Sequence, residues 1–230
     1  MRNNRHNRRY HESLERRLLL AAQMIKDINQ NGASNPADEP VLYALNSSTA
    51  LFTYDDGVHG DELWKTDGTP TGTQLVKDIV PGGIGSGIGV IEVGENGVGW
   101  FVVHDGTTQS QLWRTDGTTT GTVLVKDFST GGFGPISQLT ASGSVVYFTT
   151  TDATNGNELW KSDGTITGTV LVKDINPGPI GSSIVNLSDV GGGNVMFGAV
   201  SPTFGREPWV SDGTSGGTHM LADLNAGRGE

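Results

Sequence analysis

Short runs of apolar and β-branched residues alternate along this chain with pairs of residues that favour turns. In the cleanest stretch the runs cover residues 136–141, 144–150, 157–162 and 170–175. Runs of this length that are rich in Val, Thr, Tyr and Phe predict β-strands. Pairs such as Asp163-Gly164 predict tight turns between them, because glycine adopts positive φ without steric cost. No helical period appears after residue 30, so the pattern predicts an all-β protein.

The third run of this stretch belongs to a motif that occurs four times, with tryptophans spaced 49, 47 and 49 residues apart. The copies are ELWKTDGT at 62–69, QLWRTDGT at 111–118, ELWKSDGT at 158–165 and EPWVSDGT at 207–214. Such a period indicates supersecondary units that are each too small to bury a core alone. Four strands per unit of about 48 residues predict a β-propeller-like array of four-stranded antiparallel blades. The alternative is a β-solenoid, although solenoid repeats are usually shorter.

Each repeated residue of the motif has a structural interpretation beside a functional one. The Asp before each glycine fits a turn, whereas four equivalent Asp residues also resemble repeated metal ligands. One tryptophan per unit predicts packing between neighbouring sheets, whereas sugar stacking would need exposed rings. A lysine precedes Asp in the closing run of three units, but the fourth unit has Ala222 there, which argues against a catalytic lysine.

Composition and charge exclude several classes of function. The chain has 230 residues, 35 glycines without a Gly-X-Y period and no cysteine. Disulfides and cysteine-based metal or nucleophile chemistry are therefore absent. Residues 1–26 carry seven Lys or Arg and two acids, whereas residues 27–230 carry eight and 23, a net charge of −15. An acidic body of this kind argues against nucleic-acid or anionic-membrane partners.

The first 23 residues form a separate basic leader. Their apolar stretch, residues 18–22, is too short to span a bilayer, which needs about 20 residues, so we expect no transmembrane helix there. It is also shorter than the usual apolar region of a secretory signal, about 7–15 residues. We expect a leader at 1–23 and a repeat domain at 24–230.

Candidate chemistry is sparse. No zinc-binding histidine helix, nucleophile elbow or phosphate-binding loop occurs, so the sequence assigns no catalytic residue and no cofactor. The loop before the tryptophan run holds carboxylates six residues apart, Asp56 with Glu62 and Asp152 with Glu158. Oxygen ligands around a glycine-containing loop suit calcium. Equivalent pairs are weakened to Asp105 with Gln111 and Ser201 with Glu207, which favours the alternative that these acids cap loop amides.

The repeated residues resemble the ELWxxDGTxxGT repeat of bacterial secreted and surface proteins. Glu62-Leu63-Trp64, Asp67-Gly68-Thr69, Gly72-Thr73 and the closing Val76 to Ile79 all match, and the resemblance extends from Met24 to about Gly227. Gln111 and Pro208 depart from it. The leader similarly resembles the Glu-Ser-Leu-Glu-x-Arg-x-Leu-Leu signature of exported bacterial surface proteins, at residues 12–20. These resemblances imply an extracellular, propeller-like protein, and they imply no catalytic residue.

The closing-strand motif occurs five times, but the other strands of the unit occur four times each. Its first copy, MIKDI at 24–28, has no unit of its own. We therefore expect either a truncated member of a longer array or a small ring with this strand on its edge. Unpaired backbone groups at such an edge favour self-association.

These observations favour a non-enzymatic protein at the cell surface or outside the cell. Adhesion, matrix or ligand binding would then depend on the variable loops, with a surface glycan or a protein as partner. The alternative is a carbohydrate-active hydrolase or lyase on a propeller scaffold. That enzyme would need paired acids at one unique place, whereas the acids here recur with the repeat.

Overall fold

The computed structural model describes residues 26–28, 40–104 and 110–224, and within these ranges the secondary structure is entirely β. Sixteen strands form four separate four-stranded antiparallel sheets, here called blades 1 to 4. Blade 1 contains β1 (Tyr43–Ala44), β2 (Ala50–Asp55), β3 (Asp61–Thr66) and β4 (Gln74–Lys77). Blade 2 contains β5 (Ile91–Val93), β6 (Gly99–Val103), β7 (Gln111–Thr115) and β8 (Val123–Asp127). Blade 3 contains β9 (Ser137–Ser142), β10 (Val145–Asp152), β11 (Gly156–Ser162) and β12 (Val170–Lys173). Blade 4 contains β13 (Val185–Gly191), β14 (Asn194–Ser201), β15 (Gly205–Ser211) and β16 (His219–Met220).

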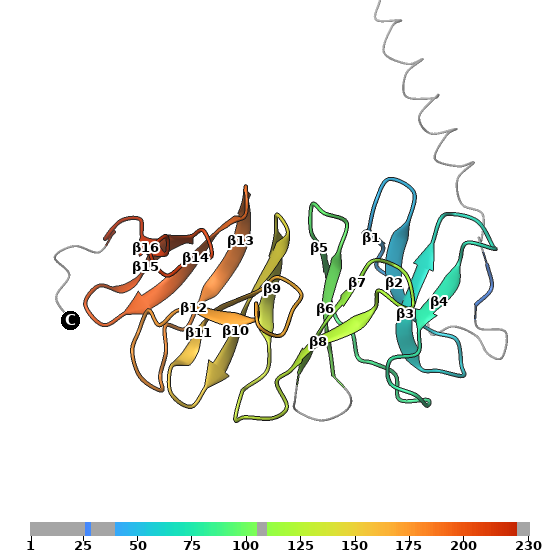
Figure 1. The fold of residues 1–230 in the computed structure, drawn as a ribbon, viewed down its shortest axis with the longest axis horizontal. Helices are drawn as coiled ribbons and strands as arrows, with labels where there is room; N and C mark the ends of the chain where they lie inside the picture. The colour runs from blue at the N-terminus through green and yellow to red at the C-terminus, as the bar shows by residue number, and fades with distance from the viewer. Residues whose placement is uncertain (1–25, 29–39, 105–109, 225–230) are drawn as a thin grey trace, which may run out of the picture.

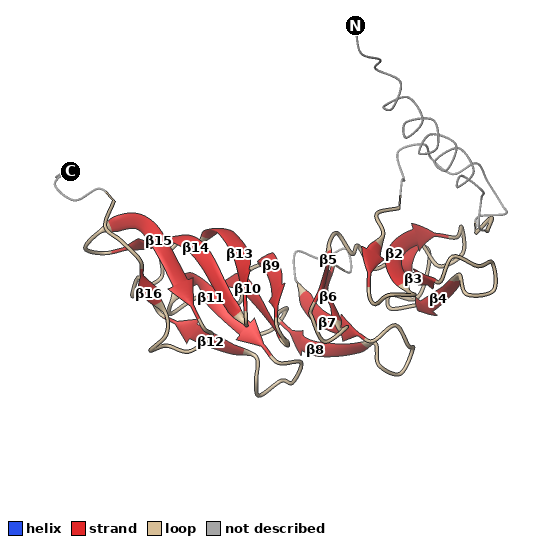
Figure 2. Ribbon diagram, turned by 90° about the horizontal axis from the view of Figure 1, so that it is seen from above, coloured by secondary structure: helices blue, strands red, loops and turns tan. Residues whose placement is uncertain are grey.

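The four blades are arranged as a fan. The first strands β1, β5, β9 and β13 gather near the middle, the later strands spread outward, and blades 1 and 4 lie at opposite ends (Figure 1). Every sheet pairs only strands of its own repeat, whereas a solenoid pairs equivalent strands of successive repeats. The predicted propeller-like array is therefore confirmed, and the solenoid alternative is wrong. Figure 2 shows the same row of sheets from above.

The two faces of each blade follow from strand alternation. In blade 3, Phe148 pairs with Trp160 across β10 and β11, and both point toward blade 2. The preceding residues on those strands, Tyr147 and Leu159, point toward blade 4. Because side chains alternate along a strand, one apolar run serves two interfaces, and both of its faces are buried.

Three apolar cores lie between neighbouring blades. The core between blades 1 and 2 includes Leu51, Leu63 and Phe101, the next includes Trp100 and Trp160, and the last lies between blades 3 and 4. Trp160 and Trp209 are each 8% exposed and pack in the second and third cores, as the packing interpretation predicts, and Trp113 is partly buried against the first core. Trp64 is 7% exposed but belongs to none of these three cores. The interfaces between blades therefore hold the fold together.

The closing lysines bridge successive blades. Lys77 Nζ donates to the Thr122 carbonyl at 2.8 Å and lies 5.4 Å from the centre of the Trp113 ring. Lys173 makes the same pair of contacts with Thr218 and Trp209. A cation over an aromatic ring, with a carbonyl acceptor beside it, adds a polar contact to each apolar interface. We call this arrangement the lysine clamp.

Only residues 26–28 of the predicted first closing strand lie within the described part of the chain, and there they form no strand. Lys26 Nζ nevertheless donates to the Thr73 carbonyl at 2.9 Å, the equivalent of the Lys77–Thr122 contact. The leader 1–23 and Asp105 lie outside the described residues. Within those residues no helix is long and apolar enough to cross a membrane.

Candidate functional site

Loops between the second and third strands of a blade, and connectors from one blade to the next, lie at the same end of the antiparallel blades. We call this end the loop rim, and it comprises residues 56–60, 81–85, 129–135, 153–155, 178–181 and 202–204. Backbone hydrogen bonds tie loop to connector: Ser86 N donates to the Asp61 carbonyl, and Ser182 N donates to the Asn157 carbonyl. The rim therefore presents its side chains from a fixed backbone.

Asp56 and Asp152, two of the predicted calcium ligands, cap their own loops. Asp56 Oδ1 accepts hydrogen bonds from the Val58 and His59 amides, and Oδ2 lies 2.8 Å from the His59 ring. Asp152 accepts from two loop amides and from the Asn155 side chain. Burial opposes ionisation of both carboxyls, but these hydrogen bonds outweigh it and hold each pKa below its ordinary value.

Glu62 and Glu158, the other two predicted ligands, are completely buried and hold the connectors. Glu62 accepts hydrogen bonds from the Ile79 and Val80 amides. Glu158 accepts from the Asn176 amide at 3.0 Å and from the Ser182 hydroxyl at 2.6 Å. Burial raises the pKa of both carboxyls, and that of Glu158 reaches about 7.

Blades 2 and 4 replace this arrangement in different ways. Gln111 Oε1 accepts a hydrogen bond from the Trp113 ring nitrogen at 3.0 Å, so the amide serves its own strand. Glu207 accepts from the Leu224 amide at 2.9 Å, which keeps the connector contact of Glu62 and Glu158. Ser201 accepts from the Phe204 amide and takes the role of the loop-capping Asp.

Each predicted calcium ligand is thus engaged with protein groups: the aspartates with the loop, the glutamates with the connector. No group of three His, Asp or Glu residues suited to a metal occurs in the ranges that the structure describes. Calcium binding at Asp56, Glu62, Asp152 and Glu158 remains a prediction from the sequence.

Several polar residues of these sites were missed by the sequence analysis. The Ser182 hydroxyl donates a hydrogen bond to Glu158, and Ser86, whose hydroxyl donates to the Asp61 carbonyl, opposes the rise in the pKa of Glu62. Asp78 and Asp174, beside the clamp lysines, further raise the pKa of those glutamates by charge repulsion, and each keeps one buried oxygen without a hydrogen-bond partner. The Gly-Ser pair that recurs in two of the connectors could have indicated these serines in the sequence.

The loop rim exposes apolar side chains in two connectors and in one loop, whereas Phe133, the equivalent connector residue after blade 2, packs against a core. Ile84 and Ile180, in the connectors after blades 1 and 3, are 80% and 81% exposed, and Phe204 is 45% exposed in blade 4. A connector isoleucine that projects from a fixed backbone offers contact area to a partner at little entropic cost.

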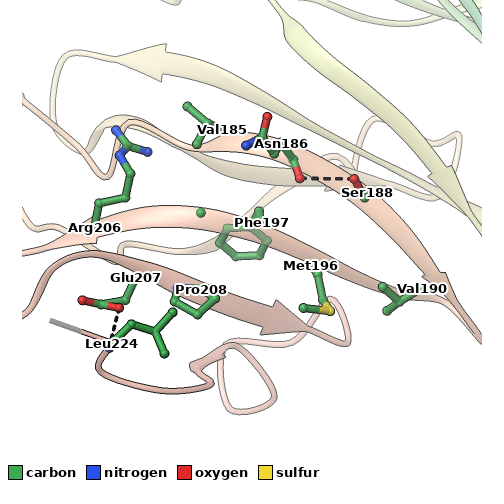
Figure 3. Close-up of a pocket in the computed structure, with 11 residues that line it drawn as sticks. Val185, Asn186, Ser188, Val190, Met196, Phe197, Arg206, Glu207, Pro208 and Leu224 are labelled. Atoms are coloured by element: carbon green, nitrogen blue, oxygen red, sulfur yellow. Dashed lines mark hydrogen bonds between the residues drawn. The ribbon is translucent and has the colours of Figure 1, made fainter.

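A second surface is the outer face of blade 4, a groove of about 520 Å³. Met196, Pro208 and Leu224 lie along it, with Arg206 at one end and Val190 at the other (Figure 3). Its lining is mostly apolar, and the hydroxyl of Ser188 donates a hydrogen bond to the Asn186 backbone carbonyl. The groove carries no pair of free carboxylates that could act in acid–base chemistry.

No protein-family model matches the chain, and no curated protein matches it in sequence. Similar solved structures include a puromycin hydrolase, with 16% identity and a TM-score of 0.53 over 79% of this chain. A prolyl endopeptidase has 11% identity and a TM-score of 0.53 over 80%, and prolyl oligopeptidase B from Galerina marginata has 15% and 0.53 over 80%. This chain spans 26–28% of the length of these three proteins. At such identities the likeness shows the fold alone, and that fold is of the propeller type.

Proposed function

We propose that this protein is a non-enzymatic binding module of the ELWxxDGT-repeat type, exported to the cell surface or beyond it. Its loop rim would contact a surface glycan or a protein ligand in adhesion or matrix assembly. The main support for the proposal is that the repeated glutamates have a structural role. Glu62, Glu158 and Glu207 each accept hydrogen bonds from a connector, and none of them is more than 2% exposed.

The exposed rim supplies the binding surface. Ile84 and Ile180 point to solvent while the backbone beside them is fixed by the bonds from Ser86 and Ser182. Apolar side chains at equivalent positions of two separate connectors suit an extended ligand better than a single small substrate. The net charge of −15 over residues 27–230 argues against a nucleic-acid partner.

One observation favours the alternative, a carbohydrate-active hydrolase or lyase. A pKa of about 7 is typical of a general acid, and Glu158 has it. A general acid must reach its substrate, however, whereas Glu158 is 0% exposed and bonded to Asn176 and Ser182. Its pKa is explained by burial in a structural role.

Binding to glycan arrays and to intact bacterial cells tests the proposal. The full chain should bind without turnover, and a combined Ile84→Ser and Ile180→Ser variant should bind about tenfold more weakly with unchanged thermal stability. Ile166→Ser is the matched control, because Ile166 is 68% exposed but lies in the β11–β12 turn at the opposite end of the blade.

Three results would count against the proposal. Polysaccharide turnover abolished by Glu158→Gln would establish the enzyme alternative. Equal binding by the rim variant and the control would remove the rim as the binding surface. Retention of the intact leader in a cytosolic fraction would contradict export.

A further inference from the structure

The outer face of blade 4 repeats the residues that bury blades 1 to 3 against their successors. At the second-strand position, Leu51, Trp100 and Tyr147 are at most 1% exposed, whereas Met196 is 38% exposed. These four residues are equivalent in the strand register, because each directly precedes the phenylalanine that pairs with the tryptophan of its blade.

The closing strand and connector show the same contrast. Their members that face the next blade are at most 6% exposed in blades 2 and 3, and in blade 1 Val76 is 3% exposed and Ile79 is partly buried. In blade 4, by contrast, Leu221 and Leu224 are 47% and 73% exposed. The buried equivalents are Val76, Val125 and Val172 in the closing strands and Phe128 and Ile175 in the connectors. Blade 4 therefore carries a continuation of three established interfaces, left uncovered in the single chain.

The complementary face belongs to blade 1. In the first and third internal interfaces the next blade contributes a Phe–Trp pair and a threonine carbonyl, and blade 1 has the same groups in Phe52, Trp64 and the Thr73 carbonyl. Blades 2 to 4 already use their corresponding faces against the blades before them.

The clamp residues of the two ends are also complementary. The lysine that should cross from blade 4 to a following blade is absent, because Ala222 stands at the position of Lys77 and Lys173. At blade 1 the corresponding acceptor, the Thr73 carbonyl, already binds Lys26 of its own chain. One end lacks the clamp lysine, and the other supplies it.

We propose that the outer face of blade 4 binds blade 1 of a second copy of this chain. Leu221 and Met196 would pack toward Trp64 of that copy, as Val172 and Tyr147 pack toward Trp209 within the chain. Trp64 is 7% exposed in the single chain, so the proposed contact requires a local rearrangement around this ring. Two copies joined twice around a two-fold axis contain eight blades, within the range of closed propellers.

Sedimentation velocity of the full chain from about 1 to 100 µM tests self-association. We expect a dimer that Met196→Glu and Leu221→Glu each weaken at least about tenfold, because each places a charge in an apolar interface. Ile180→Glu is the matched control, since this equally apolar side chain is 81% exposed and lies on the loop rim. The substituted residues are exposed in the single chain, and unchanged circular dichroism will show that the variants fold.

Cysteine pairing identifies the occupant, because the chain has no cysteine of its own. Thr119 Oγ1 bonds to the Val76 carbonyl across the first interface, and Pro70 and Leu221 stand at the equivalent places. Ala222 directly follows Leu221, and its substitution leaves the interface leucine in place. Mixing Pro70→Cys chains with Ala222→Cys chains should therefore give a disulfide between the two variants. A monomer throughout the concentration range, association that Leu221→Glu leaves unchanged, or disulfides only between two Ala222→Cys chains would each overturn the proposal.

Discussion

In each repeated Asp-Gly turn, the Asp side chain packs closely against the residues that follow it. Asp163 Oδ1 accepts hydrogen bonds from the amide and hydroxyl of Thr165, and Gly164 has a φ of 91°. The second glycine, Gly168, is required for a different reason: a Cβ there would fall on the Asp163 carboxylate. Ser162 and Thr169 join the two strands beside the turn at 2.8 Å. The same set recurs in all four blades and explains why the motif is long.

A double-mutant cycle tests this packing. Asp163→Ala should cost about 1 kcal/mol, since Gly164 keeps the turn angle. Gly168→Ala should cost about 1–3 kcal/mol by overpacking. The double variant should cost less than the sum, because removal of the carboxylate makes room for the new methyl group. Denaturant unfolding measures all three, and additive costs would contradict the proposed contact.

Glu158 should make stability depend on pH. Burial raises its pKa from 4.5 to about 7 in the folded protein, so its contribution is complete below about pH 4.5 and is lost as pH rises through 7. Between pH 5 and 8 the wild type should lose about 1–3 kcal/mol relative to Glu158→Gln, which resembles the protonated form. Asp56 raises the pKa of His59 in both proteins, so the contribution of His59 cancels in the comparison. Parallel curves of stability against pH for the wild type and Glu158→Gln would contradict the raised pKa of Glu158. Glu95→Gln is the control, because Glu95 is exposed.

At the scale of the element, the middle strands of blades 2 and 3 each serve two interfaces. Trp160 illustrates the consequence: its ring packs on Phe128 and Phe133 at 86°, and Lys126 Nζ lies 5.2 Å from it. One side chain therefore connects blade 3 to the closing strand and the connector of blade 2. Its ring nitrogen is buried without a hydrogen-bond partner, a cost that the apolar contacts offset.

Truncation of that ring should be severe. Trp160→Ala should lower the free energy of unfolding by about 3–5 kcal/mol, and Trp160→Phe by less, because part of the ring contact remains. Phe204→Ala is the control, since this aromatic ring is 45% exposed on the loop rim, and its cost should stay within about 0.5 kcal/mol. Calorimetry measures the stability of each variant. Equal losses of unfolding free energy in Trp160→Ala and Phe204→Ala would argue against the interface role of Trp160.

At the scale of the whole molecule, the protein is a one-dimensional array with unlike ends. Stability in such an array is the sum of blade and interface contributions, so an end blade lacks one of its two interfaces. Blade 1 is partly compensated by Lys26, which forms the clamp contact with Thr73. Blade 4 has a two-residue closing strand and an open apolar face.

Local opening should therefore respond to Lys26. In Lys26→Met we expect faster amide hydrogen exchange in β4 than in the wild type, by about three- to tenfold, because the clamp contact is lost. The amides of β12 in blade 3 should exchange at unchanged rates and serve as an internal control. Uniform acceleration in both strands would indicate a global effect, and no change in β4 would show that the contact carries no stability.

Much of the fold follows from the sequence alone. Strands predicted at 144–150 and 157–162 appear as β10 (Val145–Asp152) and β11 (Gly156–Ser162). Turn chemistry and side-chain alternation act between residues that are close in sequence, so they can be recognised without the fold. The same local rules gave the four-stranded unit and the burial of Trp64, Trp160 and Trp209.

The tertiary structure decided what the polar residues do. Asp56 and Glu62 form a pair along the sequence, yet one caps its loop while the other is buried under the connector 17–18 residues away. The direction of the clamp lysines, toward carbonyls 45 residues further on, likewise depends on how the blades stack. Which blade face remains open is a property of the array and of none of its repeats. Sequence determined this protein within each repeat, where the interactions are local, and tertiary structure determined it between repeats, where partners far apart in the chain meet.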